Sequence, residues 1–140
     1  MGFVILILLI SFSFYCQTNA VPPYGQLSVK GSELQGSNGQ PVQLVGMSFF
    51  WSNCDEGKVF YNYDTLKSLK CSWNANVVRA AMGVESTGCQ RPGYLDVPLT
   101  ERDKVEAVVK AAIELDMYVI IDWHDNNAPN HLDKSVSNYY

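Results

Sequence analysis

The sequence has few basic residues and lacks the common motifs of nucleotide and metal sites. Its ten Lys and Arg are scattered over 140 residues, and the formal net charge is -4, so nothing marks a basic surface for nucleic acid. No predicted strand leads into a G-x-G-x-x-G loop, which argues against nucleotide binding. No C-x-x-C pair is present, and this argues against a zinc site. We therefore expect no cofactor, no metal and no nucleic-acid partner.

What is present is the composition of an ordinary globular protein. Hydrophobic residues make up 47% of the chain and charged residues 17%, which argues against a disordered protein. A chain of this length has room for one domain with a real core.

The first 20 residues are typical of a signal peptide. A short apolar block at 4–10 is followed by small residues at Thr18 and Ala20, ahead of a cleavage point. A basic segment is missing, and a membrane anchor is the alternative, but the block is shorter than the roughly 20 residues of a spanning helix. We expect a signal peptide at 1–20 and a secreted, extracellular domain at 21–140, with no membrane attachment after cleavage.

Signal removal takes Cys16 with it and leaves Cys54, Cys71 and Cys89. Secretion permits disulfides. An odd number of cysteines allows one pair and leaves one cysteine without a partner in this chain. The spacing does not say which two cysteines pair.

The domain is predicted to begin with a β-hairpin. Residues 27–34 and 41–45 flank a turn at Asn38-Gly39, the best short hairpin signal in the chain. The second strand then emerges at 46–53 with three adjacent aromatics, Phe49, Phe50 and Trp51. These are too many for one buried face, so they either line a cleft or pack beneath a neighbouring loop.

A helix and a second strand follow the hairpin. Asp64 is the expected N-cap of a helix at 65–70, with Leu66 and Leu69 on its buried side. Residues 76–82 form an apolar strand that contains Arg79. A buried arginine needs a carboxylate or carbonyl partner. Arg79 is therefore either half of a structural ion pair or a group that steers a carboxylate at the strand's working end.

The strongest helix pattern runs from Glu101 to Leu115. The sequence at 100–103 is close to a capping box. An apolar stripe recurs with helical spacing at Val105, Val108, Val109, Ala112 and Ile113. We interpret this stripe as core.

The next strand, at 117–125, ends abruptly in Asp-Trp-His-Asp. A run apolar on nearly every residue fits a strand buried on both faces of a parallel sheet. Binding and catalytic groups of parallel α/β folds gather at the carboxyl ends of the strands. The alternative is structural: Asp122 and Asp125 cap the next helix, and Trp123 fills the core. A further helix is expected to start near His131.

Three blocks, at 46–53, 73–83 and 113–125, resemble the first three strand regions of family 5 glycoside hydrolases. The resemblance is to the endo-β-1,4-glucanases of bacteria and plant-parasitic nematodes, and it extends from about residue 22 to residue 140. It implies an α/β fold, the N-terminal part of a (β/α)8 TIM barrel with about three βα units, preceded by the hairpin. A complete barrel needs about 250 residues, so the resemblance implies that this sequence is a fragment.

The resemblance also implies an activity. Family members cleave β-1,4-glucan with retention through two glutamates, an acid/base and a nucleophile, the first in an Asn-Glu-Pro motif that this sequence lacks. Both glutamates are therefore expected beyond Tyr140, and we expect no catalytic residue in this chain itself. The expected partner is cellulose, and we expect a monomer at full length.

Five residues of this chain are candidates for the site that the resemblance implies: Arg79, His124, Trp51, Trp123 and Asn126. Arg79 matches the arginine that hydrogen-bonds the nucleophilic carboxylate, and His124 matches the histidine that contacts the sugar. Trp51 and Trp123 are candidates to line or support the cleft.

The match departs from the family after Asp125. Many relatives continue with two histidines, where this chain has Asn126 and Asn127. An Asn can still hydrogen-bond sugar hydroxyls, so Asn126 stays a candidate substrate contact, whereas His131 is expected at the surface. The chain's own strand-end carboxylates (Glu85, Asp122 and Asp125) have no spacing that implies a retaining pair, and we expect no hydrolysis by this chain alone.

Two rival functions stay open. One is a secreted, non-catalytic protein that binds glucan or a host partner through the aromatic residues near Trp51 and Trp123. The other is a family 5 hydrolase that acts on mannan or xylan.

Overall fold

The computed structural model describes residues 21–126, and the expected signal peptide, residue 127 and the helix expected near His131 lie outside this part. The described elements, in chain order, are β1 (Ser28–Lys30), β2 (Glu33–Gln35), β3 (Gly46–Ser48), α1 (Asp55–Lys58), α2 (Tyr63–Trp73), β4 (Val77–Gly83), α3 (Pro98–Glu114) and β5 (Tyr118–His124). No helix within residues 21–126 has the length and apolar character needed to cross a membrane.

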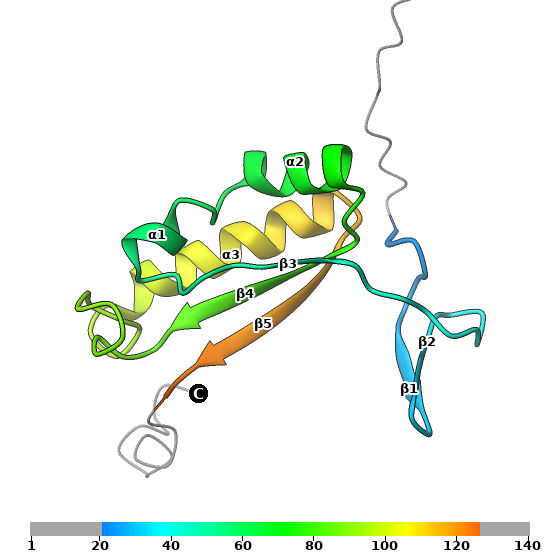
Figure 1. Ribbon diagram of the computed structural model, residues 1–140, viewed down its shortest axis with the longest axis horizontal. Coiled ribbons are helices and arrows are strands. Elements are labelled where there is room, and N and C mark those ends of the chain that lie inside the picture. The colour runs from blue at the N-terminus through cyan, green and yellow to red at the C-terminus, as the bar shows by residue number, and fades with distance from the viewer. Residues whose placement is uncertain (1–20, 127–140) are drawn as a thin grey trace, which may run out of the picture.

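Strands β3, β4 and β5 form a parallel sheet in which sequence neighbours are also spatial neighbours. Helices α2 and α3 both lie on one side of this sheet (Figure 1). Sequential strands with every helix on one face are typical of a (β/α)8 barrel, whereas doubly wound folds place helices on both faces. The observed winding agrees with the expected α/β barrel units, and the hairpin β1–β2 lies beside them (Figure 1).

The core lies between the sheet and its two helices. Val78 and Ala80 of β4 are fully buried there, together with Leu66 of α2 and Val108 of α3. Leu66 and Leu69 are the buried positions of α2, as the helical spacing predicts. The other face of the sheet is covered by neither helix, and in a barrel this face would point inward.

The hairpin forms, but with a different turn from the one predicted. Lys30 pairs with Glu33, so Gly31 and Ser32 make a two-residue turn, and the φ of +62° at Gly31 suits this tight turn. Asn38-Gly39 turns the chain a second time, after which a single bridge joins Gln35 to Pro41. The predicted pairing of 27–34 with 41–45 is therefore reduced to this bridge and a hydrogen bond from Val42 N to the Leu34 carbonyl oxygen at 3.0 Å. Pro41 has no N–H with which to extend a ladder.

Both predicted helix starts also need correction. Asn62 caps α2, because its side chain accepts a hydrogen bond from Thr65 N at 3.0 Å, and Asp64 lies in the first turn. Helix α3 begins at Pro98, a residue favoured at the first helical position. The capping box at 100–103 does not form, because Thr100 already lies inside the helix and no side chain caps its start.

Strand β5 is not buried on both faces within the described part of the chain. Ile120 and Ile121 are 51% and 59% exposed, because β5 is paired on one side only, with β4. On the neighbouring helix α3, Ile113 is also exposed, and Ala111 is buried instead. The expected burial of 117–125 and of Ile113 is thus corrected for residues 21–126.

Candidate functional site

Arg79, Asp122 and His124 lie on the face of the sheet that α2 and α3 leave uncovered. Side chains alternate along a strand, and the neighbours of Arg79 on β4, Val78 and Ala80, belong to the core on the helix side. The register pairs Ala81 with Asp122 and Gly83 with His124, which places all three polar side chains on the same face.

These three side chains form one hydrogen-bonded cluster. Arg79 Nη2 donates to Asp122 Oδ2 at 2.6 Å, and Arg79 Nη1 donates to Ser48 Oγ at 2.7 Å. His124 Nδ1 lies 2.8 Å from the same Asp122 oxygen. The Arg79 and Asp122 side chains keep 33% and 27% of their surface exposed, so the cluster is half-buried and open to a ligand. Arg79 is thus an ion-pair partner and also part of a polar surface at the strand ends.

Trp51 forms an aromatic wall beside this cluster. Its ring centroid lies 4.7 Å from that of His124, and Phe50 lies parallel to it at 5.6 Å. A Cβ atom at Gly88 would overlap the Trp51 ring, so the loop after β4 packs directly against it. Phe49 instead is buried and meets Tyr61 edge to face. Phe49 is therefore packed beneath its neighbours, and the interpretation that Trp51 lines a cleft stays a prediction.

Trp123 lies apart from the cluster. Trp123 faces the helix side of β5, where it packs against the core and meets Tyr94 edge to face at 4.9 Å. This placement matches the structural interpretation of Trp123. Asn126 is exposed just beyond β5.

Two of the strand-end carboxylates are committed to the protein itself. Glu85 is buried at the end of β4, and Asp122 is held by Arg79, so neither is an uncommitted catalytic carboxylate. The acid/base and nucleophile glutamates were expected beyond Tyr140, and Tyr140 itself lies outside residues 21–126. That expectation is not tested by the described part of the chain and stays a prediction.

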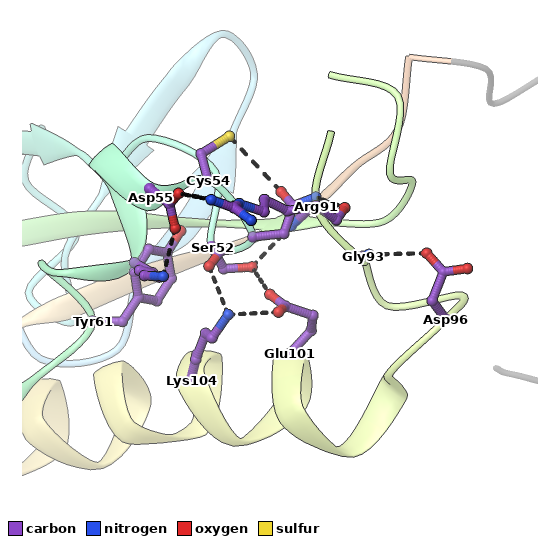
Figure 2. A network of polar contacts seen from close by, with 12 residues as sticks. Ser52, Cys54, Asp55, Tyr61, Arg91, Gly93, Asp96, Glu101 and Lys104 are labelled. Atoms are coloured by element: carbon purple, nitrogen blue, oxygen red, sulfur yellow. Dashed lines mark hydrogen bonds and ion pairs between the residues drawn. The ribbon is translucent and has the colours of Figure 1, made fainter. Parts of the chain in front are cut away.

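A buried polar network fixes the loop that carries Trp51 (Figure 2). Ser52 Oγ donates to Glu101 Oε2 at 2.5 Å and accepts from Gly83 N at 3.0 Å. Lys104 Nζ donates to Glu101 Oε1 and to the Ser52 carbonyl oxygen. The side chains of Ser52 and Glu101 are almost completely buried. The network therefore joins α3, β4 and the loop after β3 through one carboxylate.

The outer side of the same loop is tied to the loop after β4. A disulfide joins Cys54 to Cys89 with a Cα–Cα distance of 5.2 Å, which settles that pairing. Arg91 donates to Asp55 through Nε and Nη2. Hydrogen bonds from Lys58 and Arg91 lower the pKa of Asp55, so this carboxylate stays ionised and keeps both partners.

Tyr61 links the loop after β3 to strand β4. Its hydroxyl donates toward the carbonyl oxygens of Ala81 and Phe50, at 2.7 and 3.0 Å. Burial raises the pKa of Tyr61, so the phenol remains a hydrogen-bond donor throughout the ordinary pH range.

Sequence patterns singled out Arg79, His124 and Trp51 but missed the residues that hold them. Ser48 and Ser52 carry no local signal, because serine is common at strand exits. Glu101 and Lys104 have the i, i+3 spacing of an ordinary surface pair, and nothing local distinguishes them from one. Their partner Ser52 is 49 residues away in sequence.

Comparison with known proteins gives a consistent set of relatives. Residues 36–140 match the family model described as cellulase (glycosyl hydrolase family 5). An endoglucanase of Clostridium saccharobutylicum is 43% identical over 120 residues, which are 83% of this chain and 25% of that protein. A solved structure from Cytophaga hutchinsonii is 50% identical, with a TM-score of 0.69, over 76% of this chain and 33% of that one.

A third relative has a bound sugar. The catalytic domain of Thermobifida fusca endoglucanase Cel5A, solved in complex with cellotetraose, is 26% identical. Its TM-score is 0.64, over 83% of this chain and 36% of that one. The chain thus spans between a quarter and about a third of the length of these proteins.

Proposed function

Because the chain belongs to the cellulase family, glycosyl hydrolase family 5, we propose that it forms the first βα units of the catalytic domain of a secreted endo-β-1,4-glucanase. The catalytic domain then begins at residue 21, after a signal peptide at 1–20. The endoglucanase relatives and the barrel-type winding of β3, β4 and β5 support this proposal.

The observation that carries the proposal is the Arg79–Asp122–His124 cluster. It lies at adjacent parallel strands, on the sheet face that the helices leave open. In a barrel, this is where the inward face meets the catalytic end. A guanidinium held there can donate to a catalytic carboxylate and keep it ionised. An imidazole there can bind a sugar hydroxyl.

The other candidate residues take supporting roles in this proposal. Trp51 offers a ring face beside His124 on which a glucose ring can stack. Trp123 supports the end of β5 from the helix side. Asn126, exposed beyond β5, supplies an amide for sugar hydroxyls. Hydrolysis with retention also needs a pair of carboxyl groups about 5–5.5 Å apart, and in this proposal the remainder of the barrel, beyond Tyr140, provides them.

The test is hydrolysis by the full-length protein on three soluble polysaccharides: carboxymethylcellulose, mannan and xylan. We expect cleavage of the first, with retention at the anomeric carbon followed by NMR of the early products. Arg79→Ala should lower kcat by at least about 100-fold, since a group aimed at the reacting carboxylate is lost. Arg102→Ala, at an exposed pair on α3, is the control and should leave kcat unchanged.

Three other outcomes would each replace the proposal. Preferential cleavage of mannan or xylan would reassign the substrate. Inverted products would exclude the retaining mechanism. Cellulose binding without any hydrolysis, lost in Trp51→Ala, would favour a non-catalytic glucan-binding protein.

A further inference from the structure

A single oxygen atom, Asp122 Oδ2, lies at the centre of the candidate site. It is 2.6 Å from Arg79 Nη2 and 2.8 Å from His124 Nδ1, and those two nitrogens are 3.0 Å apart. The three atoms thus form a nearly equilateral triangle. Two of them are nitrogens that can compete for one acceptor, and the geometry decides where the hydrogens lie.

The triangle requires a proton on His124 Nδ1. Seen from Arg79 Nη2, the directions to the Asp122 oxygen and to His124 Nδ1 differ by about 60°, whereas the two N–H bonds of that nitrogen diverge by about 120°. One N–H of Arg79 therefore points at Asp122, and the other points well away from the imidazole. The remaining contact, from Nδ1 to the carboxylate, is a hydrogen bond only if Nδ1 is the donor.

The consequence for the imidazole is a fixed orientation with its other nitrogen available. With Nδ1 engaged by Asp122, a neutral His124 has a bare Nε2 that accepts hydrogen bonds. No group within residues 21–126 donates a hydrogen bond to Nε2, and the Trp51 ring flanks the imidazole. A sugar hydroxyl is a donor of the right kind for such an acceptor.

The consequence for the guanidinium is similar. Arginine carries five N–H donors, and Arg79 uses two of them, on Ser48 and Asp122. These two bonds leave from different terminal nitrogens, so they set the plane of the group. The other three N–H groups have no acceptor within the described part of the chain, and they are free to meet a catalytic carboxylate or a sugar oxygen.

We propose that Asp122 is a positioning residue, whose single oxygen orients Arg79 and holds the proton on His124 Nδ1 so that Nε2 accepts a hydrogen bond from a glucan hydroxyl. This inference rests on the proposed function for the identity of the ligand. Its geometric part, the state of the imidazole, is independent of any activity.

The first experiment reads the imidazole directly. Nitrogen-15 NMR of histidine side chains is recorded on the full-length protein, and the His124 signals are assigned with the His124→Gln variant. At a pH where the ring is neutral, Nδ1 should carry the proton and Nε2 should carry none. Asp122→Ala should remove this preference. Asp122→Asn keeps a carbonyl oxygen in place of Oδ2 and should retain the Nδ1 proton. Asp103→Ala, an exposed carboxylate on α3, is the matched control.

The second experiment measures kinetics on a chromogenic cello-oligosaccharide. A positioning role predicts that Asp122→Ala lowers kcat about 100-fold. Asp122→Asn should recover at least tenfold of this loss, and Asp103→Ala should match wild type. Because Asp122→Asn preserves the shape of the side chain, it keeps the test valid where Asp122→Ala does not fold.

The outcomes separate the two proposals. Wild-type hydrolysis with an unchanged His124 spectrum and kcat in Asp122→Ala would overturn the role of Asp122 and leave the glucanase proposal standing. A His124 spectrum that depends on Asp122, in a protein that cleaves no glucan, would support the geometric part and overturn the proposed function. An Nε2-protonated imidazole in the wild-type protein would contradict the inference outright.

Discussion

At the scale of single residues, the site depends on small side chains as much as on polar ones. Gly88 is the clearest case, because the Trp51 ring occupies the space where its Cβ would be. His124 lies 4.7 Å from the Trp51 ring and Phe50 lies parallel to it at 5.6 Å, so both rings limit where the indole can shift. The affinity for a stacked sugar therefore depends on where the Trp51 ring lies, and not only on its being present.

Gly88→Ala should therefore weaken substrate binding more than chemistry. We expect a KM increase of roughly tenfold on cello-oligosaccharides, about 1.4 kcal/mol, with kcat within about twofold of wild type. Steady-state kinetics on the full-length protein measures both constants. Ser86→Ala, at an exposed position of the same loop, is the control. An unchanged KM in Gly88→Ala would mean that Trp51 does not bind the sugar.

At the scale of elements, α3 and the loop after β3 are joined by the buried carboxylate of Glu101. Ser52 and Lys104 satisfy its two oxygens, and Lys104 also reaches the Ser52 carbonyl. A charge buried to this extent is tolerated only when it is paired and hydrogen-bonded. The same helix carries an ordinary surface pair, Glu106 and Lys110, which allows a matched comparison.

Glu101→Ala should cost about 3 kcal/mol of unfolding free energy, because it leaves the buried Ser52 hydroxyl without its acceptor and the Lys104 ammonium without its ion-pair partner. Glu106→Ala removes an exposed i, i+4 pair and should cost less than about 0.5 kcal/mol. Urea denaturation of the full-length protein gives both values. Equal losses in the two variants would show that the buried network contributes no more than a surface pair.

At the scale of the whole molecule, residues 21–126 leave two sheet edges and part of the helix layer uncovered. Strands β3 and β5 are each paired on one side only. Large apolar side chains that are more than half exposed include Met47, Trp73, Ile113, Ile120 and Ile121. Unpaired edges with exposed apolar residues promote aggregation.

A protein consisting of residues 21–140 should therefore be aggregated or molten. We expect a broad size-exclusion profile, weak near-UV circular dichroism and no cooperative thermal transition. Ile121→Lys, on the open edge strand, should increase the soluble fraction, whereas Thr87→Lys in a loop should not. A soluble monomer with a sharp, cooperative melt would contradict this prediction.

Local periodicity in the sequence predicts several elements of this fold. The apolar run at 76–82, the helical stripe with Val105 and Val108, and the Asp-Trp-His-Asp strand end correspond to β4, α3 and β5. The sequence also singled out Arg79, a charged residue in an apolar strand, and His124, in the polar cluster at a strand end, as candidate site residues. These patterns are predictive because strand alternation and helical spacing depend only on residues that are neighbours in the sequence.

Which partners these residues meet depends on how the whole chain folds. Arg79 and Asp122 are 43 residues apart, and they meet because β4 and β5 pair in one particular register. Glu101 has the sequence signature of a helix start, yet it lies inside the protein because Ser52 is there to receive it. A hydrogen bond between distant segments depends on geometry set by the whole fold, so it cannot be predicted from the local sequence.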